Sequence, residues 1–131
     1  MSLTKGIHHV AIKAAGVEHF NKTMEFYTEI LGMPVVRSWG EGDNRGAMVD
    51  TGAGVMEIFS NAPDTLDQGA LRHIAFDTDD TDACIEAVKK GGYTVTVEPT
   101  DIVIQADKPL AARIAFCIGP VGETVEFFQV K

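Results

Sequence analysis

The stretch "IHHVAIKA" at residues 7–14 decides the fold, because a variant of it returns as "LRHIAFDT" at residues 71–78. Both copies read as a β-strand whose successive side chains point to opposite faces. In the first copy this alternation puts His9 on one face and His8 on the other, where we expect His8 to lie under a helix. In register with the second copy, His9 matches His73. The repeat therefore indicates a duplicated structural unit.

The first copy begins a series of five elements. Apolar residues at three- and four-residue steps predict a helix over Val17–Leu31, with Phe20, Met24, Tyr27 and Leu31 as its buried stripe. Gly32 is placed to end this helix as a left-handed cap. Three strands are then predicted at Val35–Trp39, Gly46–Asp50 and Val55–Ser60.

The second copy begins the same series after a polar segment, Asn61–Gln68, that we interpret as a linker. It predicts a strand at Ala70–Asp77, a helix at Asp79–Lys90, and strands at Tyr93–Glu98, Ala112–Ile118 and Thr124–Val130. The fold class is therefore α+β. We expect one domain over residues 1–131, in which two tandem βαβββ modules, about 5–60 and 70–131, form a curved, barrel-like mixed sheet around a metal-binding cleft.

Composition narrows the classes of function. The chain has 131 residues, is 45% hydrophobic and carries a formal charge of −8, without a cluster of basic residues. Nucleic acid and membrane surfaces are therefore poor partners. No apolar run is long enough to cross a bilayer and no signal peptide is evident, so we expect a cytoplasmic protein. Cys84 and Cys117 form no CxxC pair and are expected to be small buried thiols.

Four polar residues lie inside apolar strands at equivalent places in the repeat. His9 matches His73, and Glu57 in "VMEIF" matches Glu126 in "TVEFF". A buried carboxylate without a partner is so unfavourable that its pKa shifts until it is neutral. One divalent cation would satisfy all four residues, and the absence of a thiolate argues against a closed structural zinc site. The alternative is that each residue is a separately hydrogen-bonded buried group.

The chain resembles the vicinal oxygen chelate superfamily, which includes glyoxalase I, methylmalonyl-CoA epimerase, extradiol dioxygenases and fosfomycin and bleomycin resistance proteins. The resemblance extends from "HHVAI" through "FYTEILGMPVVR" and "LRHIAF" to "GPVGETVEFFQ". Family membership alone does not choose a reaction, because the fold supports many.

The ligand pattern of the chain is similar to that of glyoxalase I. The resemblance implies that His9, Glu57, His73 and Glu126 bind one Ni, Zn, Co, Mn or Fe ion. It also implies a lyase or isomerase that moves a proton through a metal-stabilised enediolate of a small oxygenated substrate, with Glu126 as the base and Glu57 as its counterpart. Epimerases of the family typically have Gln in place of Glu57.

Candidate substrate-binding residues are cationic or aromatic. Lys13 stands where glyoxalase I commonly has an Arg that holds a glutathione carboxylate, and Arg113 is a second candidate anion ligand. Arg37 and Trp39 share a face of their strand, and Arg45 lies in the possible rim "WGEGDNRG". A surface role for the last three is equally consistent with the sequence. Asp107–Leu110 lies in a long segment between strands that we interpret as a lid.

Two other functions stay open. An Fe(II)-dependent ring-cleaving dioxygenase would use only His9, His73 and Glu126, so Glu57 counts against it. A metal-free drug-binding resistance protein generally lacks the four ligands. The family resemblance also implies a homodimer, in which the metal site forms within one chain or between two. The natural substrate, the metal and any role of glutathione are not readable from the sequence.

Overall fold

The computed structural model describes residues 2–3 and 5–131. The chain divides into two compact units, Met1–Leu66 and Asp67–Lys131. The boundary lies within the predicted linker. Each unit contains one four-stranded mixed sheet and one α-helix, so the α+β class and the repeated βαβββ order are confirmed.

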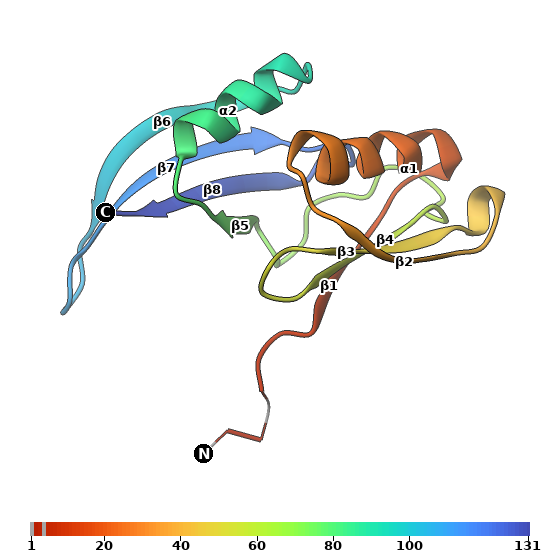
Figure 1. Cartoon of the computed structure of the whole chain (residues 1–131), viewed down its shortest axis with the longest axis horizontal. Helices are drawn as coiled ribbons and strands as arrows, with labels where there is room; N and C mark the ends of the chain where they lie inside the picture. Colours follow the sequence, from red (N-terminus) through yellow and green to blue (C-terminus); the bar gives the residue numbers. More distant parts are fainter. Residues whose placement is uncertain (1, 4) are drawn as a thin grey trace. The chain divides into compact units, whose positions relative to one another are not determined.

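Unit 1 contains β1 (His9–Lys13), α1 (Gly16–Met24), β2 (Val35–Trp39), β3 (Gly46–Asp50) and β4 (Val55–Phe59). Its strands lie in the order β1-β4-β3-β2, with β1 parallel to β4 and the other pairs antiparallel. In Figure 1, α1 lies along one face of this sheet. Met56 and Ile58 are buried while their neighbours on β4 are only partly covered, so the predicted alternation of this strand is confirmed.

The helix of unit 1 changes its geometry part-way. After α1, residues Glu25–Ile30 form a π-helical turn, and Gly32 then takes a φ of +79°. The predicted left-handed cap is therefore present. The adjacent rings of Phe26 and Tyr27 both lie in this turn and are both fully buried. A regular helical stripe predicts only the second of them.

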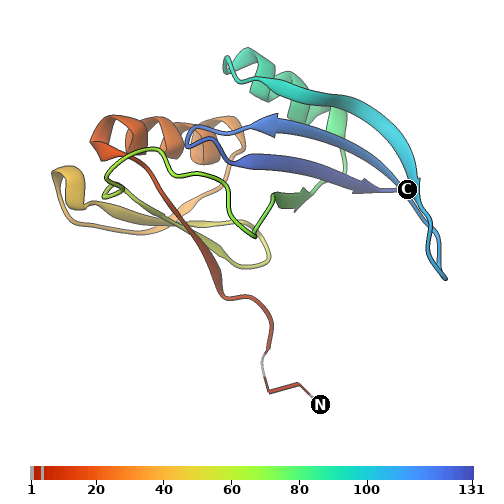
Figure 2. The ribbon, with the colours of Figure 1, turned by 180° about the vertical axis from the view of Figure 1, so that it is seen from behind.

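Unit 2 contains β5 (Ile74–Asp77), α2 (Thr81–Lys90), β6 (Val95–Ile104), β7 (Leu110–Ile118) and β8 (Thr124–Val130). The strand order is β5-β8-β7-β6, which repeats the order of unit 1. Val125 and Phe127 of β8 are buried, as alternation predicts. Figure 2 shows β5, β8 and β7 side by side in this sheet.

Two expectations about the sheets need correction. Among the described residues, the strands form two open four-stranded sheets and do not close into a barrel. The expected long segment around Asp107–Leu110 is instead a β6–β7 hairpin: β6 continues to Ile104, and β7 already begins at Leu110. The reason is cross-strand pairing, since Ile104 pairs with Leu110 and completes the hairpin. Only a short turn remains where we expected a lid.

Candidate functional site

The first candidate pair lies on the face of the unit 1 sheet opposite the buried side chains of Met56 and Ile58. His9 begins β1 and Glu57 occupies the middle of the adjacent parallel strand β4. Because Glu57 pairs with Ala11 and His9 with Val55, the two side chains are diagonal neighbours on one face. His9 Nε2 lies 3.7 Å from Glu57 Oε1, and the side chains are 41% and 15% exposed.

The second candidate pair has the same construction in unit 2. His73 directly precedes β5, and Glu126 lies on the parallel neighbour β8. His73 Nε2 lies 3.2 Å from Glu126 Oε1, and the Glu126 side chain is only 9% exposed. Burial raises the pKa of Glu126, and the neighbouring His73 opposes part of that rise. The ring of Phe116 meets the His73 imidazole edge to face at 5.5 Å.

The donor atoms of each pair suit a divalent cation. Two ligand atoms that each lie about 2.1 Å from a cation, at a right angle to each other, are about 3.0 Å apart. At wider angles the two ligand atoms are farther apart. The separations of 3.7 Å and 3.2 Å are close to this spacing. Within the described part of each unit, no third His, Cys, Asp or Glu joins the pair. Each unit by itself therefore offers two ligands, one imidazole and one carboxylate.

The position of His8 differs from our expectation. His8 precedes β1 and is exposed, so it does not lie under a helix. Its Nδ1 atom lies 2.9 Å from His9 Nδ1, and the two rings meet edge to face. The strand begins only at His9, so alternation does not govern His8. The contact leaves His9 Nε2 facing Glu57.

Three of the predicted substrate-binding residues lie on the same face as Glu57. Lys13 pairs with Phe59 on β4, two residues beyond Glu57. Arg37 and Trp39 pair with Met48 and Gly46 of β3, which in turn pair with Glu57 and Phe59. Arg37 and Trp39 thus share a face, as the sequence predicts.

Arg45 lies elsewhere in unit 1. Its guanidinium group sits 5.7 Å from the centre of the Phe20 ring, and Nη1 donates to Asn21 Oδ1 at 3.4 Å. Both of those residues belong to α1. Arg45 therefore packs against the helix and not on the face of Glu57. It lines a cavity of about 490 Å³ together with Phe20 and Met24 of the helix.

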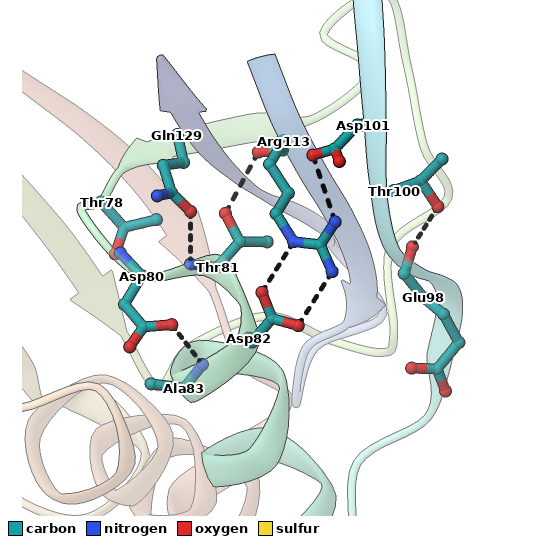
Figure 3. A network of polar contacts seen from close by, with 10 residues as sticks. All are labelled: Thr78, Asp80, Thr81, Asp82, Ala83, Glu98, Thr100, Asp101, Arg113 and Gln129. Atoms are coloured by element: carbon teal, nitrogen blue, oxygen red, sulfur yellow. Dashed lines mark hydrogen bonds and ion pairs between the residues drawn. The ribbon is translucent and has the colours of Figure 1, made fainter. Parts of the chain in front are cut away.

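Arg113 faces the helix of unit 2. Figure 3 shows its guanidinium group between two carboxylates, with Nε and Nη2 donating to Asp82 at 2.7 and 3.0 Å and Nη1 to Asp101 at 3.1 Å. On β7, alternation puts Arg113 on the face opposite Phe116, which pairs with Glu126. The placement of Arg113, like that of Arg45, therefore does not support its predicted role in substrate binding.

Sequence reasoning placed Phe59 on the face of Glu57, because Phe59 lies two residues beyond Glu57 on a strand that alternates. It overlooked Gly46, whose role depends on the ring of Trp39 on the neighbouring strand. That contact exists only once β2 and β3 are paired.

The chain belongs to the glyoxalase/bleomycin resistance protein/dioxygenase superfamily, whose family model matches residues 6–127. It is 30% identical over 131 residues to a lactoylglutathione lyase of Neisseria meningitidis, covering 94% of this chain and 89% of that one. It is 32% identical over 123 residues to a probable lactoylglutathione lyase of Vibrio parahaemolyticus, covering 88% of this chain and 86% of that one.

A solved structure shares the fold. The glyoxalase family protein from Enterococcus faecalis matches 97% of this chain and 99% of its own with a TM-score of 0.70 and 24% identity. None of the described helices has the length and apolar character to span a bilayer. The superfamily includes bleomycin resistance proteins beside glyoxalases and dioxygenases, so membership alone does not choose the function.

Proposed function

We propose that the protein is a divalent-metal-dependent lyase or isomerase of glyoxalase I type. The observation that carries this proposal is the matched pair of His–Glu contacts, one in each unit. The similarity to proteins named lactoylglutathione lyase supports the same reaction class. The substrate is a small oxygenated compound with a proton on a carbon beside a carbonyl group.

His9, Glu57, His73 and Glu126 together hold one divalent cation, either within one chain or between two chains of a homodimer. Nitrogen and oxygen donors of this kind suit Ni, Zn, Co, Mn or Fe. When bound, the cation stabilises negative charge that develops on the substrate oxygens. The contact of Glu57 with His9 supports four ligands over the three of a ring-cleaving dioxygenase.

Glu126 acts as the base in this proposal. Burial raises the pKa of its carboxyl group, so its carboxylate accepts a proton more readily than an exposed one. One of its carboxylate oxygens takes the proton from the substrate carbon and returns it to the neighbouring carbon. The proton of the substrate hydroxyl passes to the former carbonyl oxygen, so the product is an isomer of the substrate. Glu57, which is more exposed, holds the cation and faces the substrate from unit 1.

The test is isomerisation of hemithioacetals that methylglyoxal forms with thiols, after the protein is loaded with each of the five ions. Glu126→Gln removes the base and is expected to lower kcat by about 100-fold or more, a common effect of losing a general base. Glu29→Gln, at an exposed position on the π-helical turn, is the control and is expected to keep full activity.

Metal content by mass spectrometry completes the test. The wild-type protein is expected to retain one ion for each set of four ligands. The Glu57→Ala variant is expected to bind the ion less tightly and to lose it. The proposal fails if no ion binds, or if Glu126→Gln is as active as wild type. A cytoplasmic location and a homodimer stay predictions.

A further inference from the structure

Four residues form a line across the sheet of unit 1, and we call it the Trp39 row. Cross-strand pairs join them in order, from β1 to β2: Lys13, Phe59, Gly46 and Trp39. The row lies on the face that carries Glu57, two residues further along the strands. Because strands rise about 3.3 Å per residue, the row is about 7 Å from the line that contains Glu57. A substrate whose reacting carbons lie at Glu57 therefore reaches the row with the remainder of its structure.

The ring of Trp39 has a defined position in this row. A Cβ atom at Gly46 would lie 2.3 Å from Cε2 and Cζ2 of the indole, so the ring lies directly over the glycine backbone. Any other residue at this position would displace the ring. The indole also meets the Phe59 ring edge to face at 6.1 Å and remains 40% exposed. The row thus presents an aromatic surface that is held in place but open to a ligand.

Two cations flank this aromatic surface. Lys13 Nζ lies 5.9 Å from the centre of the Phe59 ring, and Arg37 lies two residues before Trp39 on the same face of β2. Among residues 2–3 and 5–131, neither cation forms an ion pair, whereas Lys89 and Arg113 each have a carboxylate partner. The formal charge of the chain is −8. Two cations without carboxylate partners on one face of such a chain favour an anionic ligand.

We propose that the Trp39 row binds the part of the substrate remote from the reacting carbons, and that this part is a flat apolar group bearing a carboxylate. The inference rests on the proposed function, because it takes the reacting carbons to lie beside Glu57. Stacking on Trp39 and Phe59 selects a flat group. Lys13 and Arg37 select the negative charge.

Binding of benzoate to the wild-type chain tests the inference without turnover. The chain has one Trp, so the single indole N–H signal in a ¹H–¹⁵N spectrum reports on the row alone. Benzoate is expected to shift this signal saturably. Benzamide, which lacks the charge, and cyclohexanecarboxylate, which is not flat, are each expected to bind about threefold to fivefold more weakly.

Variants separate the contribution of the Lys13 charge from that of the aromatic rings. Lys13→Gln is expected to weaken benzoate binding about threefold to fivefold, while Lys22→Gln, an exposed lysine of α1, leaves it unchanged. Trp39→Leu is expected to abolish binding measured by calorimetry. Circular dichroism checks that each variant folds, and Phe59→Leu provides a second aromatic variant if Trp39→Leu does not fold.

The outcomes distinguish the inference from the proposed function. The inference is overturned if benzoate does not move the indole signal, if the three probes bind equally, or if Lys13→Gln behaves as Lys22→Gln does. Selective benzoate binding without isomerase activity would support ligand binding at the Trp39 row, while the proposed reaction would be wrong. Isomerase activity without benzoate binding would overturn the inference that the Trp39 row binds the substrate, and it would still support the proposed reaction.

Discussion

Glu57 and Glu126 occupy equivalent positions on β4 and β8 but have different surroundings. Glu126 lies closer to its histidine, 3.2 Å against 3.7 Å, and is the more deeply buried of the two. Because burial disfavours the charged carboxylate, the pKa of Glu126 is raised above its ordinary value. This difference is the physical reason for assigning the base to unit 2.

Cys117 offers a prediction at the same scale. Burial raises the pKa of its thiol to about 11, so only about one molecule in a thousand is thiolate at pH 8. In Cys84→Ser, which leaves Cys117 as the single thiol, we expect reaction with an aromatic disulfide reagent to be at least about tenfold slower in the folded than in the unfolded protein. Cys117→Ser is the matched variant, because Cys84 is only half-buried. Equal rates in Cys84→Ser before and after unfolding would contradict the prediction.

At the scale of elements, the start of α2 depends on a side-chain cap. Asp80 accepts a hydrogen bond from the backbone N–H of Ala83 at 2.9 Å, and Figure 3 shows this contact beside the Arg113 network. Asp80→Ala is expected to lower the free energy of unfolding by about 1 kcal/mol, because an N-terminal donor of the helix loses its partner. Urea denaturation measures the effect. Asp80→Asn keeps an acceptor oxygen and should be nearly neutral; a loss as large as that of Asp80→Ala would count against capping.

The ion pair of Arg113 with Asp82 predicts a pH dependence of stability. The hydrogen bonds from Arg113 lower the pKa of Asp82 below its usual value in the folded protein. The stabilisation is therefore present above the ordinary carboxyl pKa of about 4 and is lost as the pH falls through the lowered folded value. We expect Asp82→Asn to lower Tm at about pH 6 and to match wild type at about pH 2. Asp79→Asn, which removes an exposed charge outside this network, serves as the control, and a Tm difference that does not shrink in acid would refute the linkage.

At the scale of the whole molecule, the four proposed ligands link cation binding to stability. A cation that binds only the folded state at about 100 times its Kd adds about 2.7 kcal/mol. We expect a matching rise in Tm when the ion is added and its loss on chelation. His9→Ala and His73→Ala should each remove most of the rise, since each unit contributes one imidazole. His19→Ala, on α1, should retain it. A rise that survives either ligand variant would rule out a site shared by both pairs.

Much of each unit could be predicted from the sequence, because its signals are local. Strand alternation placed Glu57 and Glu126 on the faces away from Met56 and Phe127, and the structure agrees. The repeat predicted the partners His9 and His73, which lie in contact with those carboxylates. That these residues bind a metal stays a prediction.

Other features depended on contacts between strands that no local pattern contains. Val35 and Arg37 are two residues apart, yet a bulge in β2 directs Val35 toward the helix side and Arg37 toward Glu57. The guanidinium group of Arg113 pairs with Asp82 of α2 and with Asp101 of the neighbouring strand β6. The sequence by itself determined the repeated order of elements and the residues of each His–Glu pair, since periodicity and duplication are properties of the chain. Strand alternation also predicted that Lys13 lies on the face of the proposed ligands. Only the tertiary structure decided that Arg37 shares the face of Glu57 and that the Trp39 ring lies over Gly46, because pairing between β2, β3 and β4 sets both.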